Sequence, residues 1–399
     1  MPESQEVVHE DRLRVLSIFG TRPEAVKMAP VIQRLGSAPQ VDSLVCVTAQ
    51  HREMLDQVLD LFGIHPHYDL DLMKPDQSLA DLTAAVIKGL DSVLQEADPD
   101  WVLVQGDTTT VMAASLLAYY HRIPVGHVEA GLRTGDKWQP FPEEINRRVT
   151  GALADLHFAP TDWAKANLLR EGVPDRQIVV TGNPVIDALQ RVAAKPYDFE
   201  GGPLRGLPEG RRLILVTVHR RENFGQPVES IFRALRHIAE TYADDVYLVY
   251  PMHLNPNVHG PAHRVLGKVP NIRLVEPLDY LPMVQLMKRA YLVLTDSGGL
   301  QEEAPSLGTP VLVLREKTER PEAIEAGTAR LVGTDFERIV SETRLLLDDR
   351  QARDRMGRAI NPYGDGHAAE RIVAALLEAS HGAAPGRLGA RAPRHFGTP

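Results

Sequence analysis

The chain of 399 residues contains a single cysteine, Cys46, so neither a disulfide nor a cysteine-based metal site can form within one chain. No apolar run approaches the roughly 20 residues that a helix needs to cross a bilayer. Residues 1–11 are polar and acidic and do not resemble a signal peptide. We therefore expect a cytoplasmic protein in which Cys46 is a buried core residue and not a nucleophile.

Positive charge is also scarce, because 44 Lys and Arg stand against 53 Asp and Glu, a formal net charge of −9. A chain without a basic stripe is a poor candidate for binding nucleic acid or an anionic membrane. A small anionic ligand is still compatible with this composition, since a local site can be positive on an acidic protein.

The usual cofactor signatures are missing as well. No Gly-x-Gly-x-x-Gly follows the first apolar run, and no Walker loop occurs. The histidines His51, His127, His219 and His253 do not have a metal-ligand spacing. We therefore expect neither a dinucleotide cofactor nor a metal ion.

What the sequence does contain is an alternation of short apolar runs with amphipathic segments. Nearly continuous apolar runs are typical of parallel strands that are covered on both faces. The chain is longer than one hydrophobic core usually supports, and its apolar runs form two series. We therefore predict an α/β protein with two doubly wound, Rossmann-like domains. The predicted strands are 13–19, 43–48, 101–105 and 123–128, then 212–218, 246–250, 272–275, 291–295 and 311–314.

Two segments do not fit this alternation. Residues 195–210 are rich in Gly and Pro and are predicted to lie in or near the linker between the domains. Residues 381–399 are rich in Gly, Ala, Pro and Arg and are predicted to be a disordered tail.

The most informative motif is 295–303, TDSGGLQEE, which follows a predicted strand and leads into a helix predicted at 302–307. A strand that ends in Ser297-Gly298-Gly299 and turns into a helix exposes unpaired N–H groups at the positive end of that helix. Glu303 follows one turn later and suits the hydroxyls of a ribose. Together these residues indicate a nucleoside diphosphate site, although an ordinary Gly-rich turn would have the same composition.

Polar residues follow several of the predicted strands. Ligands of open parallel sheets bind beyond the carboxyl ends of the strands, so we expect these residues to converge on one cleft between the domains. They are Arg22 and Lys27 after the first strand, Asp107 after the third, Glu129 after the fourth and His219 in the second domain.

Each of these residues also has a structural interpretation. Asp107 could cap the next helix, and Glu129 could pair with Arg133. Glu143 and Glu144 could be first-turn acids that stabilise a helix dipole. Residues 219–222 could be a solvated charged run.

Seven motifs together resemble the non-hydrolysing UDP-N-acetylglucosamine 2-epimerases. The resemblance covers about 13–379 and implies a GT-B-like fold with the active site in the cleft between the domains. It implies domains at 12–182 and 183–365, with a last helix at 366–380 that packs back on the first. The motifs are FGTRPEAVKM at 19–28, TAQHR at 48–52, GDTTT at 106–110, HVEAG at 127–131, PEE at 142–144, HRRE at 219–222 and TERPE at 318–322.

The resemblance also implies roles for individual residues. Ser297, Gly298 and Gly299 would hold the diphosphate, Glu303 the ribose, and Arg22 and Arg320 the nucleotide. Met283 stands where some members have an aromatic residue near the uracil, and methionine can still pack on a ring. The implied catalytic residues are Asp107, Glu129, Glu143 and His219, and Lys27 lies on the substrate side.

The implied reaction interconverts UDP-GlcNAc and UDP-ManNAc through elimination of UDP, without a redox cofactor or metal. Bacterial members are dimers and bind a second UDP-GlcNAc as an activator, and Gln50, His51 and His253 resemble residues of that second site. Three rivals remain: a GT-B glycosyltransferase, a UDP-sugar sensor without turnover, and an epimerase of a modified UDP-sugar.

Overall fold

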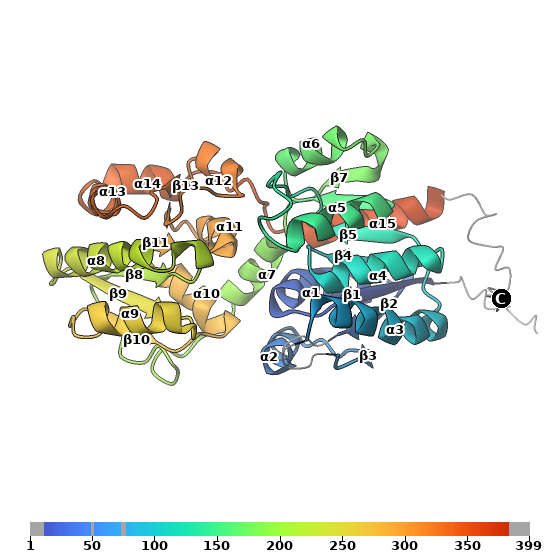
Figure 1. Cartoon of the computed structure of the whole chain (residues 1–399), viewed down its shortest axis with the longest axis horizontal. Helices are drawn as coiled ribbons and strands as arrows, with labels where there is room; N and C mark the ends of the chain where they lie inside the picture. The colour runs from blue at the N-terminus through green and yellow to red at the C-terminus, as the bar shows by residue number, and fades with distance from the viewer. Residues whose placement is uncertain (1–11, 49–51, 73–76, 383–399) are drawn as a thin grey trace, which may run out of the picture. The chain divides into compact units, whose positions relative to one another are not determined.

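A computed structural model describes residues 12–48, 52–72 and 77–382 of the chain. They fall into two compact units (Figure 1). Unit 1 comprises the described residues up to Pro184 and those from His367 onward, and unit 2 runs from Val185 to Gly366. The boundary lies at the start of helix α7 (Pro184–Ala193).

Unit 1 is built on a seven-stranded sheet in the order β3-β2-β1-β4-β5-β6-β7, and every pairing is parallel. The order reverses between β1 and β4, which makes their carboxyl ends the topological switch point of the sheet. The strands are β1 (Leu13–Phe19), β2 (Val41–Val47), β3 (Tyr68–Asp69), β4 (Trp101–Gln105), β5 (Val125–Val128), β6 (Leu156–Ala159) and β7 (Ile178–Val180).

Four helices of unit 1, α1, α3, α4 and α6, begin at a residue whose side chain caps the helix. Thr21 and Glu24 form a capping box at the start of α1, where Pro23 occupies the first turn. The last helix, α15, packs against α1. The helices are α1 (Arg22–Gly36), α2 (Arg52–Phe62), α3 (Leu79–Ala97), α4 (Thr109–Tyr120), α5 (Glu143–Leu153), α6 (Asp162–Arg170) and α15 (Ala368–Gly382).

Unit 2 has a six-stranded sheet in the order β10-β9-β8-β11-β12-β13, again with every pairing parallel. Its switch point lies between β8 and β11. The strands are β8 (Arg212–Thr217), β9 (Val246–Pro251), β10 (Ile272–Val275), β11 (Leu292–Thr295), β12 (Val311–Val313) and β13 (Ala329–Leu331). The helices after α7 are α8 (Gln226–Thr241), α9 (Pro256–Leu266), α10 (Tyr280–Arg289), α11 (Gly298–Ser306), α12 (Pro321–Glu325), α13 (Phe336–Asp348) and α14 (Arg350–Gly357).

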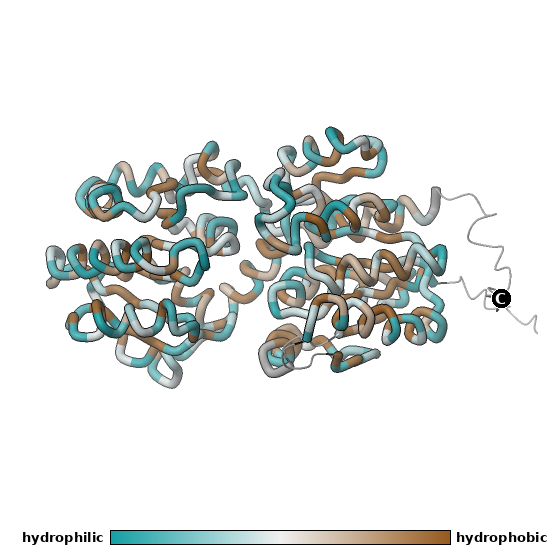
Figure 2. The backbone as a smooth tube through the Cα atoms, in the orientation of Figure 1, coloured by the Kyte–Doolittle hydropathy of each residue, from teal (hydrophilic) through white to brown (hydrophobic). Residues whose placement is uncertain are grey.

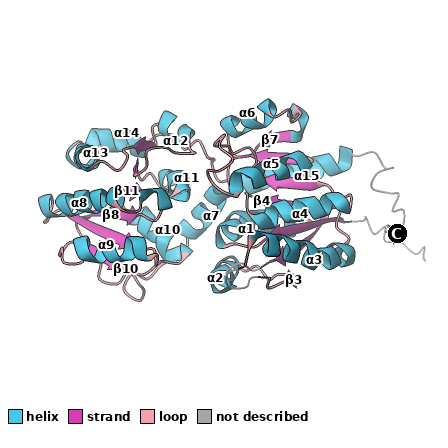
Figure 3. Ribbon diagram, viewed as in Figure 1, coloured by secondary structure: helices cyan, strands magenta, loops and turns pink. Residues whose placement is uncertain are grey.

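The core of each unit lies between the sheet and its helices (Figure 3). β4 and β11 are buried along their whole length, as their continuous apolar sequences predict. Figure 2 shows the hydropathy of each residue along the backbone. Cys46 is buried in β2, and burial raises its pKa to about 12. The prediction of two doubly wound α/β domains is confirmed.

Several details differ from the sequence predictions. α11 begins at Gly298 rather than at 302, because Gly298 and Gly299 form its first turn. Segment 195–210 lies inside unit 2, where the Arg273 guanidinium donates to the Arg205 and Pro203 carbonyls. It therefore lies near the boundary at 184–185 but is not the interdomain linker itself. α15 extends to Gly382, two residues into the predicted tail; residues 383–399 lie outside the described residues. No helix among the described residues is long and apolar enough to span a membrane.

Candidate functional site

The switch point of unit 1 is held together by one buried carboxylate, that of Glu24. Its oxygens accept hydrogen bonds from the Gly20 and Thr21 amides at 2.8 and 2.7 Å and from the Thr108 hydroxyl at 2.6 Å. Burial raises the pKa of Glu24, and these hydrogen bonds oppose that shift. Glu24 therefore ties the loop after β1, which precedes Arg22, to the loop after β4, which contains Asp107.

Glu129 follows β5 and has a left-handed backbone with φ of 62°. This conformation is strained for a residue with a side chain and is typical of functional positions. The Lys27 ammonium lies 2.6 and 2.7 Å from the two carboxylate oxygens, and the side-chain amides of Asn183 and Gln105 also donate to them. The alternative pairing of Glu129 with Arg133 is wrong, because Arg133 pairs with Glu171 at 2.7 Å.

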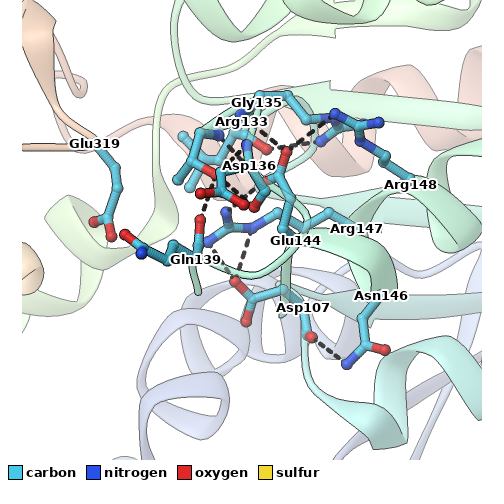
Figure 4. A network of polar contacts seen from close by, with 12 residues as sticks. Asp107, Arg133, Gly135, Asp136, Gln139, Glu144, Asn146, Arg147, Arg148 and Glu319 are labelled. Carbon is cyan, nitrogen blue, oxygen red and sulfur yellow. Dashed lines mark hydrogen bonds and ion pairs between the residues drawn. The ribbon is translucent and has the colours of Figure 1, made fainter. Parts of the chain in front are cut away.

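Asp107 makes a two-pronged contact with Arg147 of α5 (Figure 4). The guanidinium Nε and Nη2 atoms lie 2.9 and 2.7 Å from the carboxylate, and the Asn146 side chain donates to the Asp107 carbonyl. The alternative in which Asp107 caps the next helix is wrong, since Thr108 accepts from the Val111 amide at the start of α4.

The adjacent residues Glu143 and Glu144 have different environments. Glu144 is fully buried and accepts from the Thr134 and Gly135 amides. It also pairs with Arg147 (Figure 4). The Oε2 atom of Glu143 is buried without a hydrogen-bond partner among the described residues. Glu144 is therefore structural, and Glu143 has an oxygen available to a ligand.

His127 of β5 stabilises the same edge of the sheet. Its Nε2 atom donates to the Gly106 carbonyl at 2.7 Å, in the loop that leads to Asp107. Burial lowers the pKa of His127 to about 3, so the ring is neutral at physiological pH. The next strand contributes His157 beside it, where burial lowers the pKa to about 4.

In unit 2 the start of α11 has the features of an anion site. Ser297 is the N-cap residue, yet its side chain makes no capping hydrogen bond, and the first-turn N–H groups have no intrahelical acceptors. A Cβ atom on Gly298 would lie 2.9 Å from the guanidinium of Arg320, so glycine allows this close approach. Arg320 is oriented by Glu302 and Glu319, each at 2.7 Å.

Glu303 is buried on α11 and accepts a hydrogen bond from the Tyr280 hydroxyl at 2.7 Å. Tyr280 starts α10, and Met283 lies one turn further along the same helix, half-buried. The predicted ribose and uracil residues thus belong to two helices that this hydrogen bond connects.

His219, after β8, is held by Asp296, a residue to which sequence reasoning assigned no role. Asp296 is fully buried and accepts from the amides of His219 and Arg220 and from the Asn223 side chain. Its carboxylate also lies 3.2 Å from Nδ1 of His219. The alternative of a freely solvated run at 219–222 is therefore wrong for His219 and Arg220, whereas Arg221 and Glu222 are exposed. The signal in the sequence that could have identified Asp296 is its position directly before the turn Ser297-Gly298-Gly299, which we call the anion turn.

The structure describes some of the remaining predicted site residues and not others. Arg22 is the first residue of α1 and is half-buried. His253 stacks on His219, with ring centroids 5.8 Å apart. Gln50 and His51 lie outside the described residues. In the part of the chain that the structure describes, no group of three or more acidic, His or Cys side chains is arranged to hold a metal ion.

Comparison with known proteins identifies close relatives. The family model described as UDP-N-acetylglucosamine 2-epimerase matches residues 33–377. The UDP-N-acetylglucosamine 2-epimerases of Salmonella typhimurium and Escherichia coli K12 are each 56% identical, over 91% of this chain and 98% of theirs. The crystal structure of UDP-GlcNAc 2-epimerase from Neisseria meningitidis bound to UDP-GlcNAc superposes with a TM-score of 0.85 at 49% identity, covering 92% of this chain and 100% of that one.

Proposed function

The chain belongs to the UDP-N-acetylglucosamine 2-epimerase family, and we propose how its residues carry out the interconversion of UDP-GlcNAc and UDP-ManNAc. The observation that supports this proposal best is the set of carboxylates at the carboxyl edge of the unit 1 sheet. Asp107 and Glu129 are each paired with a cation, and Glu143 has a buried oxygen to which no group in the described part of the chain donates.

The chemistry requires a leaving group before a proton can be removed. The C2 hydrogen of the sugar is not next to a ketone, so its direct removal is difficult. If the C1–O bond breaks first, UDP leaves as a stable anion and positive charge develops at C1 and the ring oxygen. C2–H then becomes acidic, and loss of its proton gives 2-acetamidoglucal. Protonation of C2 from the opposite face and return of UDP give the epimer.

Unit 2 supplies the groups that a leaving UDP needs. We assign the diphosphate to Ser297, Gly298 and Gly299 at the start of α11, where the N–H groups and the helix dipole favour an anion. Arg320 lies against Gly298 and would add a positive charge. Glu303 would accept from the ribose hydroxyls, and Met283 would pack on the uracil. Arg22 of unit 1 is proposed as a further nucleotide contact.

Unit 1 supplies the acid–base groups. Two of its carboxylates would exchange protons with opposite faces of C2, and the third would stabilise the oxocarbenium-like state. Lys27 holds both oxygens of Glu129 and Arg147 holds Asp107, so both carboxylates are fixed in orientation. Glu143 is the carboxylate with an available oxygen.

The direct test is incubation with UDP-GlcNAc alone, followed by proton NMR. An epimerase forms UDP-ManNAc without an acceptor. A glycosyltransferase does not form it, and a UDP-sugar sensor binds the nucleotide sugar without turnover. A panel of modified UDP-sugars in the same assay identifies the preferred substrate. Absence of UDP-ManNAc from every preparation that binds UDP-GlcNAc would contradict the proposal.

We also propose regulation by a second molecule of UDP-GlcNAc. His253 resembles a residue of that second site in bacterial relatives, and its ring stacks on His219, which gives a contact through which occupancy could affect catalysis. We further propose that the protein is a cytoplasmic homodimer that supplies ManNAc to cell-surface polysaccharide. Sigmoidal dependence of the rate on UDP-GlcNAc and a dimer mass in solution are the expected results.

A further inference from the structure

The structure brings His219 and the anion turn of α11 to the same edge of the unit 2 sheet. Thr217 of β8 pairs in register with Thr295 of β11. His219 and Ser297 each follow two residues beyond this pair, and Asp296, directly before Ser297, accepts a hydrogen bond from the His219 amide at 2.9 Å. A diphosphate bound at the start of α11 would therefore place its negative charge beside the His219 ring.

Asp296 holds both the backbone and the ring of His219. Its carboxylate accepts from the amides of His219 and Arg220 at 2.9 Å, so it cannot move without disturbing this loop. Asn223 donates to it at 3.0 Å and also to the Leu314 carbonyl. Nδ1 of His219 lies 3.2 Å from the carboxylate. A bare Nδ1 would put two acceptors face to face, so the ring proton belongs on Nδ1.

The other charged groups near His219 oppose one another. Burial is the main influence and lowers the pKa of His219, and Arg220 and His253 lower it further. Asp296 and Glu222 raise it. The free ring is therefore neutral at neutral pH, with one proton on Nδ1, and Nε2 is available to a ligand.

We propose that Asp296 is a positioning residue for His219, which presents Nε2 to the diphosphate of a bound UDP-sugar so that binding takes up one proton from solvent. The proton adds to Nε2, and the resulting imidazolium contacts the diphosphate while Asp296 balances its charge. The cation then faces the leaving group before the C1–O bond breaks, as transition-state stabilisation requires. This inference rests on the proposed diphosphate site.

The experiment is calorimetric titration with UDP-GlcNAc at neutral pH in two buffers of different ionisation enthalpy. Both phosphates of UDP-GlcNAc are esterified and have no titrating proton there, so the uptake reports on the protein. An Asp107→Asn background suppresses turnover. We expect uptake approaching one proton, which decreases at lower pH as the free ring becomes protonated.

Three variants identify the group. His219→Gln is expected to abolish the uptake. Asp296→Asn keeps the shape but removes the charge. It is expected to reduce the uptake by at least half and, in the protein that retains Asp107, to reduce kcat by on the order of 10-fold to 100-fold. Asp245→Asn, which breaks a surface pair with Arg212 in the same unit, is expected to leave both unchanged. The inference would be overturned if the Asp107→Asn parent took up no proton on binding UDP-GlcNAc, or if addition of His219→Gln left the full proton uptake.

If Asp296→Asn does not fold, nitrogen NMR of the wild-type protein with labelled histidine provides the second measurement. We expect the His219 signal, assigned by its loss in His219→Gln, to show a proton on Nδ1 in the free protein and on both nitrogens with UDP-GlcNAc bound. A free ring with its proton on Nε2 would contradict the inference. Formation of UDP-ManNAc could persist in either case, so this failure is distinguishable from failure of the proposed function.

Discussion

Adjacent side chains of the same type have different functions in this protein. Glu143 and Glu144 both begin α5, and both carry the negative charge that suits a helix N-terminus. Glu144 uses its carboxylate to hold the backbone of Thr134 and Gly135, whereas Glu143 keeps one buried oxygen without a partner among the described residues. Both residues are glutamates in the first turn of α5, so only their long-range contacts distinguish their roles.

At this residue scale, removal of one of the proposed catalytic carboxylates has an expected cost. We predict that Asp107→Asn or Glu129→Gln lowers kcat by on the order of 100-fold or more, the loss typical of a positioned acid or base. Steady-state turnover of UDP-GlcNAc measures this effect. The control Glu240→Gln breaks an exposed pair with Arg236 and is expected to leave kcat unchanged. Near-wild-type rates in both test variants would refute these assignments.

The close approach of Arg320 to Gly298 gives a second prediction. An added methyl group in Gly298→Ala meets the guanidinium at 2.9 Å and displaces it. Loss of one charge-assisted hydrogen bond costs roughly 1.5–3 kcal/mol, so we expect UDP to bind at least about 10-fold more weakly by calorimetry. The matched control is Gly260→Ala in α9, where the added methyl group meets nothing within 4 Å. Equal affinity of the two variants would show that Arg320 does not contact UDP.

At the scale of elements, Glu24 connects α1 to α4 through the Thr108 hydroxyl. We predict that Thr108→Val destabilises unit 1 by about 1–3 kcal/mol, because it removes the cap of α4 and leaves a buried carboxylate oxygen of Glu24 without its donor. Thr108→Ser retains the hydroxyl and is expected to have a much smaller effect. Urea unfolding of both variants measures the difference, and equal stabilities would contradict this view of Glu24.

Elements were easier to predict from the sequence than the contacts between them. Buried strands such as β4 and β11 are continuous apolar runs that pattern alone located, whereas the short buried strand β6 was not predicted. The pair Lys27–Glu129 joins residues 102 positions apart, and no local signal records it. The left-handed backbone of Glu129 and the buried contacts of Asp296 likewise depend on tertiary structure. Sequence therefore indicated the edge of each sheet where we propose that chemistry occurs, but not how each side chain is held.

At the scale of the whole molecule, the buried histidines of unit 1 predict sensitivity to acid. Burial lowers the pKa of His127 to about 3 and of His157 to about 4, whereas unfolded histidine titrates near 6.5. Between these values the unfolded chain binds more protons, so the free energy of unfolding decreases as the pH falls. The slope is about 1.4 kcal/mol per pH unit for each histidine.

Tryptophan fluorescence of the full chain reports on unit 1 alone, because all three tryptophans precede Pro184. They are Trp101, Trp138 and Trp163. We expect urea unfolding followed by tryptophan fluorescence to show a marked loss of stability between pH 6.5 and pH 4. His157→Gln should reduce the slope by one proton. A stability that is constant over this range would contradict neutral buried rings.

The central claim is that UDP leaves, the C2 proton is removed and C2 is protonated again by carboxylates of this chain. The most direct measurement is the reaction of UDP-GlcNAc in deuterium oxide, followed by NMR and mass spectrometry of the UDP-ManNAc formed. The account predicts one deuterium at C2 of the product, introduced at the rate of epimerisation. UDP-ManNAc that forms with its original hydrogen at C2 would contradict it.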